Sequence, residues 1–174
     1  MRVSVIGVSG NGKTTFARRL AAKLRVRYVE LDAIVHQAGW RQASDAEARE
    51  AVRAIVDSPE GWVIDGSYVK KLGDLVFEHA DMVVWLDQPL LLVVRRLVKR
   101  ALVDIVTQRD LFNGNRQTWR YAFFQRESLV SYAIAEHFRR RRETPAYFAA
   151  RPHIRLVRVR HPRELEELLA TLAP

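Results

Sequence analysis

The sequence of 174 residues contains no cysteine, and this absence excludes two kinds of protein. Without thiols, neither a disulfide framework nor a thiolate metal site can form. Nothing in the composition therefore points to an oxidising compartment, and we expect a cytoplasmic protein. The first residues also lack the charged and apolar segments of a secretory signal, because a glycine-rich loop already begins at Gly7.

Long hydrophobic runs are also missing. The longest apolar stretch, residues 82–94, is interrupted by Asp87 and Pro89 and is too short to cross a bilayer, so we expect no membrane partner. Four of the five histidines show no spacing typical of metal ligands and are interpreted as surface or packing residues: His79, His137, His153 and His161. The chain is nevertheless 48% hydrophobic, which is enough to bury a continuous core, and we expect one globular domain over residues 1–174.

Positive charge is abundant but confined to one segment. The formal net charge is +9; residues 1–94 carry 12 basic and 12 acidic side chains, whereas residues 95–142 carry 12 basic and 4 acidic ones. A charge that served only solubility would be spread over the whole surface. The concentration of charge in residues 95–142 therefore predicts a surface that faces an anion.

Apolar patterns alternate between strand and helix along the chain. Short apolar runs predict strands over residues 3–6, 27–31, 62–64, 82–86 and 154–159. Helical spacing and capping signals predict helices over residues 13–24, 44–56, from 89 onward, 119–141, 144–149 and 162–172. Residues 104–118 contain an Asn-Gly-Asn turn and are interpreted as a mobile excursion. The alternation predicts an α/β fold, a doubly wound parallel sheet of five strands with helices on both faces.

The segment 7–14, Gly-Val-Ser-Gly-Asn-Gly-Lys-Thr, has the pattern of a phosphate-binding loop between a strand and a helix. Its glycines allow backbone N–H groups to turn toward phosphate, and the following helix adds the positive end of its dipole. Lys13 would reach the β- and γ-phosphates, and the Thr14 hydroxyl would bind Mg²⁺. The residues predicted to bind ATP here are Gly7, Ser9, Gly10, Asn11, Gly12, Lys13, Thr14 and Thr15.

Further motifs resemble the adenylate-kinase-like P-loop family. Segments 61–66 and 80–87 are similar to the strand-Asp-Gly element of these enzymes and to their next strand. The closest resemblance is to the bacterial group labelled topology modulation protein, a kinase-like group of the AAA-type ATPases, and the segments that carry it are 31–32, 39–41, 65–68, 112–116 and the Arg-rich helix. The resemblance covers nearly the whole chain. It implies a three-layer P-loop NTPase fold of the nucleoside or small-molecule kinase type, with residues 95–142 as a basic helical lid.

The basic segment supplies candidates for neutralising the charge on a transferred phosphoryl group, because guanidinium groups bind phosphate oxygens in a bidentate manner. We expect Arg96, Arg100, Arg109 and Arg116 to fold over the phosphate. Of these, Arg109 and Arg116 are predicted to be catalytic, together with Lys13, and Arg100 to contact the nucleotide. The alternative is a solvated helix face, which is our main interpretation of the block 139–142.

Two carboxylates follow predicted strands, at the edge where ligands bind in open α/β sheets. Asp32 lies where kinases similar to shikimate or gluconate kinase place an acidic residue near the acceptor hydroxyl. It could orient or deprotonate an alcohol or hold Mg²⁺ through water, or it could be a cap or turn residue. Asp65 could complete the Mg²⁺ shell or contact the acceptor. Asp87 precedes Pro89 and is interpreted as a structural helix cap.

The predicted acceptor pocket is lined by loops that contain His36, Trp40, Arg41 and Tyr68. Its aromatic rings could stack on a base or a sugar, although Trp40 could equally pack against the next helix. By resemblance alone, the turn 158–162 falls where related enzymes hold the adenine ring through backbone contacts.

Three functions fit these features. The first, which we favour, is a kinase that uses ATP and Mg²⁺ to phosphorylate a small hydroxyl or phosphate acceptor. The second is a nucleotide-dependent regulator or nucleic-acid-associated ATPase, in which the basic segment contacts a phosphate backbone. The third is a kinase that acts on the end of a polynucleotide. The nucleic-acid functions are less favoured, because the basic residues lack the interleaved solvent-facing aromatics of a stacking platform.

Overall fold

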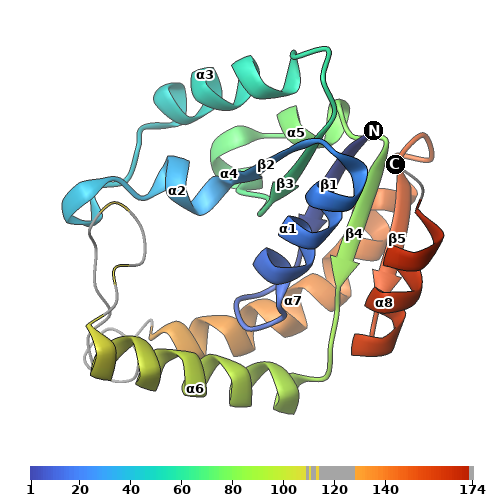
Figure 1. The fold of residues 1–174 in the computed structure, drawn as a ribbon. Helices are drawn as coiled ribbons and strands as arrows, with labels where there is room; N and C mark the ends of the chain where they lie inside the picture. The colour runs from blue at the N-terminus through green and yellow to red at the C-terminus, as the bar shows by residue number, and fades with distance from the viewer. Residues whose placement is uncertain (109, 111–112, 114–127, 173–174) are drawn as a thin grey trace.

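The structure is a computed structural model that describes residues 1–108, 110, 113 and 128–172 (Figure 1). In this part of the chain, five strands form one sheet in the order β2-β3-β1-β4-β5. All neighbouring strands are parallel. The strands are β1 (Arg2–Ile6), β2 (Arg27–Glu30), β3 (Trp62–Asp65), β4 (Met82–Leu86) and β5 (Arg155–Val159). The predicted α/β fold with a parallel five-stranded sheet is confirmed.

Helices cover both faces of the sheet, and successive side chains of a strand pack on opposite faces. In β3, Val63 packs with buried side chains of helices α1 (Lys13–Leu24) and α8 (Pro162–Thr171). Its neighbours Trp62 and Ile64 pack on the other face, with α3 (Asp45–Val56), the short helix α5 (Leu75–Glu78) and the end of α7 (Leu129–Ala149). The near-continuous apolar runs of the central strands follow from this double coverage.

The remaining helices connect the strands. They are α2 (Leu31–Val35), the 3-10 helix η1 (Ala38–Trp40), α4 (Val69–Leu72), α5 (Leu75–Glu78), α6 (Leu90–Thr107) and α7 (Leu129–Ala149). The sequence did not predict α2, η1, α4 or α5, because elements of five residues or fewer are too short to show a helical period. The predicted start of α3 is confirmed: Ser44 Oγ accepts from Glu47 N, and Glu47 Oε2 accepts from Ser44 N at 2.7 Å.

Helix α6 is longer than predicted. It continues to Thr107, so residues 104–107 belong to a helix and not to the expected mobile excursion. Asp104 and Ile105 are buried there, and Ile105 forms a small apolar cluster with Ala101. Burial of this inner face supports the last turns of the helix. Of the rest of the predicted excursion, only residues 108, 110 and 113 are described.

Helix α7 is one continuous element where two helices were predicted. It runs through Pro145, which lacks the N–H needed for one helical hydrogen bond. Thr144 and Phe148 on either side of the proline are buried, and Phe148 belongs to the core cluster under the sheet. Packing of these neighbours therefore holds the helix together across the proline. Residues 119–127 of the predicted long helix lie outside the described residues.

The carboxyl ends of the strands point toward the side of the molecule where α6 and α7 lie (Figure 1). The connections that leave these ends include the phosphate-loop segment after β1, α2 after β2, and residues 66–68 after β3. The same edge of the sheet thus gathers the segments that the sequence singled out. Across the described ranges, we find no helix with both the length and the apolar character needed to span a bilayer.

Candidate functional site

The phosphate-loop segment forms a tight turn between β1 and α1. Gly7, Gly10 and Gly12 have φ angles of 151°, 88° and 84°, values that side chains rarely allow. A Cβ on Gly10 would lie 2.6 Å from the carbonyl oxygen of Val93, and one on Gly7 would lie 2.7 Å from that of Leu86. Glycine is therefore required both by the backbone angles and by the close approach of β4 and α6.

Asn11 anchors this loop to the end of strand β4. Its side chain is buried, and Nδ2 donates to the carbonyl oxygen of Leu86 at 2.9 Å. The backbone N–H of Asn11 points back to the carbonyl oxygen of Val8 at 3.3 Å. The residue was predicted as a nucleotide contact, and the structure gives its side chain the task of anchoring the loop to β4.

Lys13, Thr14 and Asp65 meet at the start of α1. Lys13 Nζ lies 3.4 Å from the carbonyl oxygen of Val8, so the ammonium group curls over the loop. Thr14 Oγ1 donates to Asp65 Oδ2 at 2.6 Å, and Asp65 Oδ1 is buried without a hydrogen-bond partner among the described residues. Burial raises the pKa of Asp65, against the opposing effects of the Lys13 charge and the Thr14 hydrogen bond.

A hydroxyl beside a carboxylate with one unsatisfied oxygen fits a Mg²⁺ ion. This ion prefers oxygen ligands and is usually bound by one or two carboxylates together with phosphates and water. Thr14 and Asp65 would supply the protein ligands, and Asp32 is close enough to act electrostatically on Asp65. No group of three or more His, Cys, Asp or Glu side chains that could form a dedicated metal cage occurs in the described ranges.

Asp32 lies in the first turn of α2, directly after β2, as its position after a predicted strand led us to expect. The Tyr68 hydroxyl donates to Asp32 Oδ1 at 2.6 Å and lies 3.0 Å from Nε2 of His36. The predicted pocket residues Tyr68 and His36 are thus brought together around the carboxylate. Trp40 follows in η1, and Arg41 is exposed and contacts Gln37 and Glu47.

A cavity of about 590 Å³ joins the phosphate loop to Asp32. Its walls come from the loop itself, from α2, from residues 66–70 and from α7. Apart from the loop glycines and aliphatic residues, it is lined by Ser9, Lys13, Asp32, Ser67, Tyr68, Lys70, Phe77, Tyr132, Glu136, Arg139, Arg140, Glu143, Thr144, Tyr147 and Phe148. One cavity therefore borders both the predicted phosphate cradle and the predicted acceptor carboxylate.

Two arginines of the block 139–142 line this cavity, which differs from the solvated helix face that we expected. Glu136 Oε1 accepts from Arg139 NH2 at 2.6 Å and from Arg140 Nε at 2.8 Å. Arg140 NH2 also donates to Ser67 Oγ at 3.1 Å. Burial opposes ionisation of Glu136, but hydrogen bonds and charges of the two guanidinium groups outweigh it and lower the pKa of Glu136.

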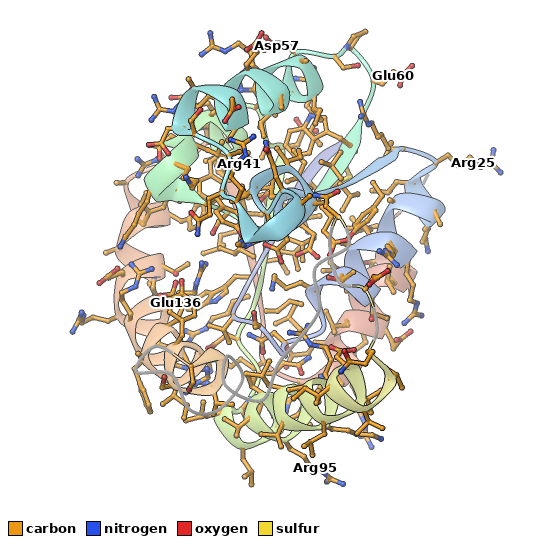
Figure 2. All side chains as sticks on the ribbon, turned by 90° about the vertical axis from the view of Figure 1, so that its left-hand side faces the viewer. Arg25, Arg41, Asp57, Glu60, Arg95 and Glu136 are labelled. Atoms are coloured by element: carbon orange, nitrogen blue, oxygen red, sulfur yellow. The ribbon has the colours of Figure 1, made fainter. Side chains whose placement is uncertain are left out.

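The spacing of these charges signals one shared helix face, although it does not show that this face points inward. Residues three and four apart lie on the same face of a helix, and Glu136, Arg139, Arg140 and Glu143 follow this spacing. The apolar pattern of α7 gave no such signal, because the cavity-lining face is polar. Figure 2 labels Glu136 on α7 and Arg95 on α6, where Arg95 extends outward into solvent.

The next arginine of the block faces a different partner. Arg141 Nε donates to Asp87 Oδ1 at 2.7 Å, and Arg158 NH2 donates to Asp87 Oδ2 at 2.6 Å. Asp87 is only 3% exposed, and the Arg158 guanidinium stacks over Trp85 at 4.3 Å. Asp87 is structural, as predicted, but it does not cap a helix: α6 begins at Leu90 without a side-chain cap.

The other predicted nucleotide and phosphate contacts are scattered. Thr15 is exposed on α1, and Arg100 is exposed on α6. Arg96 NH1 donates to Gln88 Oε1 at 2.7 Å and lies 3.8 Å from the position that a Cβ on Gly12 would take, so this guanidinium stands beside the phosphate loop.

The two predicted catalytic arginines, Arg109 and Arg116, lie outside the described residues. Between them, Asn113 Nδ2 donates to the carbonyl oxygens of Ala33 and His36, at 3.2 and 2.6 Å. This residue of the predicted lid therefore contacts α2 next to Asp32.

A second hollow, of about 550 Å³, lies at the turn after β5 and is lined by residues 161–164. His161 and Pro162 belong to the turn that the resemblance associates with the adenine ring. The hollow is formed by four consecutive residues, none of which lines the cavity beside the phosphate loop.

The sheet order and the strand–loop–helix cradle define a P-loop protein of the kinase-like fold class. No protein-family model matches the chain. It is 30% identical over 113 residues to a shikimate kinase of Nitrobacter winogradskyi, covering 57% of this chain and 52% of that protein. It is 28% identical over 124 residues to a shikimate kinase of Gloeobacter violaceus, covering 64% of this chain and 68% of that protein. The first match thus spans about half of the relative's length.

Solved structures agree on the fold. The shikimate kinase of Bacteroides thetaiotaomicron superposes with a TM-score of 0.60 at 16% identity, covering 98% of this chain and 94% of that one. The shikimate kinase of Acinetobacter baumannii, solved in complex with shikimate, gives a TM-score of 0.56 at 14% identity, with 97% and 88% coverage. The P-loop kinase-like resemblance is confirmed at this level, and the narrower resemblance to topology modulation protein stays a prediction.

Proposed function

We propose that this protein is an ATP-dependent kinase that phosphorylates a hydroxyl group of a small acceptor. The observation that carries the proposal is the single cavity that borders both the phosphate loop and Asp32. A γ-phosphoryl group held by the loop and an acceptor hydroxyl held by Asp32 would meet within it. Phosphoryl transfer depends mainly on such positioning and on charge neutralisation. A site that already holds the two substrates next to each other is therefore the central requirement.

The donor side of the proposed reaction rests on the phosphate loop. Its backbone N–H groups and Lys13 would hold the ATP phosphates, while Thr14 and Asp65 would hold Mg²⁺. When bound, this ion would neutralise charge on the phosphate oxygens. Arg96, which lies beside the loop, would add a further positive charge, and we keep Arg100, Arg109 and Arg116 as predicted phosphate contacts.

The acceptor side rests on Asp32. The acceptor oxygen would attack the γ-phosphorus, the bond from that phosphorus to the β–γ bridging oxygen would break, and ADP would leave. The hydroxyl proton would pass to an oxygen of Asp32, which acts as general base. In this proposal Asp32 therefore binds the acceptor hydroxyl and takes its proton. If Asp32 also belongs to the Mg²⁺ shell, it would contact the ion through a water molecule.

The chemistry of the cavity indicates the class of acceptor. Arg139 and Arg140 present guanidinium groups, which match carboxylates and phosphates, on the α7 wall of the cavity that Asp32 also lines. The curated relatives are shikimate kinases, and one similar structure holds shikimate. We therefore propose a small hydroxylated acid as acceptor, with shikimate as the first compound to test.

A second candidate function is a nucleotide-dependent regulator or nucleic-acid-associated ATPase of the topology modulation type. The observation in its favour is a row of exposed cations on α6. Arg95, Lys99 and Arg100 form no ion pair with any carboxylate of the described chain, whereas Arg139 to Arg142 all pair with acidic residues. These exposed cations are few, and we rank this function second.

The decisive experiment measures ADP release against a panel of sugar acids, sugars, nucleosides and nucleoside monophosphates, with shikimate included. We expect one small acceptor to stimulate ATP turnover, with loss of the stimulation in Asp32→Asn and of all turnover in Lys13→Ala. Lys23→Ala, at the far end of α1, is the matched lysine control. Tight, salt-sensitive DNA binding without acceptor-stimulated turnover would favour the second function.

A further inference from the structure

Tyr68 has a backbone conformation that its position does not explain. Its φ and ψ angles are 43° and 38°, in the left-handed region, which is unfavourable for a residue with a side chain. In the described chain, the other non-glycine residues with positive φ are Arg25, Gln108 and Asn113. Arg25 and Gln108 end helices, where this conformation is common, and asparagine tolerates it. Tyr68 instead precedes a helix, where an extended residue is the rule.

This conformation places the Tyr68 hydroxyl between two side chains of the α2 segment. The hydroxyl has one hydrogen, and an ionised carboxylate can only accept. The O–H of Tyr68 therefore donates to Asp32 Oδ1 at 2.6 Å, and Nε2–H of His36 donates to the hydroxyl oxygen at 3.0 Å. This direction of hydrogen bonding assigns the Nε2 proton to His36.

The contact leaves the second oxygen of Asp32 available to the cavity. Asp32 and Tyr68 both line the cavity, and no hydrogen bond from a described residue reaches Asp32 Oδ2. The next residue toward β3, Ser67, accepts a hydrogen bond from Arg140 on the opposite wall. Residues 67 and 68 thus tie the carboxylate wall and the arginine wall to the same short connection after β3.

We propose that Tyr68 is a positioning residue for the acceptor site. Its hydroxyl holds one oxygen of Asp32 so that the other oxygen faces the acceptor hydroxyl, and His36 holds the Tyr68 hydroxyl in turn. This inference rests on the proposed kinase function. The energetic cost of the Tyr68 backbone is then the cost of placing one oxygen atom, which is the kind of strain that functional sites retain.

The test compares Tyr68→Phe with the wild type in the acceptor-stimulated assay, using shikimate or whichever panel compound the wild type phosphorylates. The phenyl ring keeps its packing against the core, and only the hydroxyl is lost. We expect kcat to fall about 10- to 100-fold while KM for ATP stays unchanged, because a misplaced reacting group costs rate and not nucleotide affinity. Tyr28→Phe, which removes a hydroxyl outside the cavity, is the control.

Substitutions of His36 add a readout that a purely structural role would not move. In His36→Gln the amide nitrogen can take the place of Nε2–H, and we expect most of the activity to be retained. His36→Leu fills the space without a donor and should reduce kcat several-fold. Equal effects of glutamine and leucine would contradict the proposed role of the Nε2 proton.

Unfolding experiments test the contact without any acceptor. In a double-mutant cycle, Tyr68→Phe and Asp32→Ala should lower the urea midpoint less than additively, because each substitution removes one partner of the same hydrogen bond. Additive effects, or wild-type kcat in Tyr68→Phe, would overturn the inference and leave the kinase function intact. Absence of acceptor-stimulated turnover in the wild type would instead overturn the proposed function, and the cycle would still decide whether Tyr68 holds Asp32.

Discussion

Thr14 Oγ1 lies 2.6 Å from Asp65 Oδ2, so the first turn of α1 is tied to the end of the neighbouring strand β3. The contact joins two segments that are 51 residues apart in the sequence. It also orients a hydroxyl and a carboxylate toward the same point beside the phosphate loop. A ligand that needs both groups would find them already in place.

Substitution of Thr14 tests this pair directly. We expect Thr14→Val to lose at least roughly 100-fold in acceptor-stimulated turnover, because its size is kept while the hydroxyl that would bind Mg²⁺ is removed. Thr14→Ser keeps the hydroxyl and should retain activity within about tenfold. The measurement is turnover as a function of Mg²⁺ concentration. A valine variant that needs no more Mg²⁺ than the wild type would refute the assignment.

Gly10→Ala tests the geometry of the loop. The new Cβ would lie 2.6 Å from the carbonyl oxygen of Val93, so the loop or α6 has to move. We expect nucleotide affinity to fall at least tenfold and the free energy of unfolding to fall by about 1–3 kcal/mol. Gly39→Ala is the control, because Gly39 also has a positive φ but no atom lies within 4 Å of the position that a Cβ would take. Its effect therefore measures the cost of the backbone conformation without a steric clash. Isothermal titration with an ATP analogue and urea unfolding provide the two values.

The arginine block 139–142 offers an internal comparison. Arg140→Ala removes a cavity guanidinium and should raise the acceptor KM about tenfold or more without changing KM for ATP. Arg141→Ala leaves the buried Asp87 with one partner and should lower the free energy of unfolding by about 1–2 kcal/mol. Arg142→Ala, with a side chain 79% exposed, should change neither value. Equal kinetic effects at positions 140 and 142 would contradict the inward placement of Arg140.

Asp74 predicts a dependence of stability on pH. Partial burial opposes its ionisation, but hydrogen bonds from Tyr147 and Arg151 outweigh this effect and lower the pKa of Asp74. A group whose pKa is lower in the folded state stabilises the fold above its unfolded pKa, about 3.9 for aspartate, and loses this contribution as the pH falls through the folded pKa.

The stability difference between wild type and Asp74→Asn should therefore be about 1–2 kcal/mol at pH 7 and should shrink below about pH 4. Urea unfolding at several pH values between about 7 and about 2.5 measures it. Glu60→Gln, at an exposed position on the periphery of the molecule, is the control (Figure 2). A difference that stays constant over this whole pH range would show that packing, and not ionisation, accounts for it.

The sequence predicted the parts of the fold that have a strong local signal. The phosphate-loop pattern in residues 7–14 predicted the strand before it and the helix after it, because this motif occurs between a strand and a helix. The five strands were predicted within one or two residues, since a buried parallel strand reads as an apolar run. Asp32 followed from its place after such a run.

The wall formed by α7 was not predicted, for a physical reason. Arg139 and Arg140 face a polar cavity, and a helix face that lines a polar cavity has the same composition as one that faces water. Only the tertiary arrangement distinguishes Arg140 from Arg142. Arg140 contacts Ser67 across the cavity, whereas Arg142 pairs with the adjacent residue Glu143 on its own helix. The continuity of α7 through Pro145 was hidden for a similar reason, because packing of Phe148 outweighs the local signal of proline.

Adjacent residues of α7 have different partners on different sides of the helix, and this restricts how related sequences can diverge. Arg140 reaches the cavity while Arg141 pairs with Asp87, and one residue added to a helix rotates all later side chains by about 100° around its axis. A single codon inserted at the start of α7 would still leave an arginine at each of these two positions, because residues 139–142 are all arginine. It would, however, put Ala135 in the place of Glu136 and Tyr147 in the place of the buried Phe148. Descendants of this protein can therefore change acceptor preference by replacing side chains on the cavity face of α7, whereas changes in the length of that helix are closed to them.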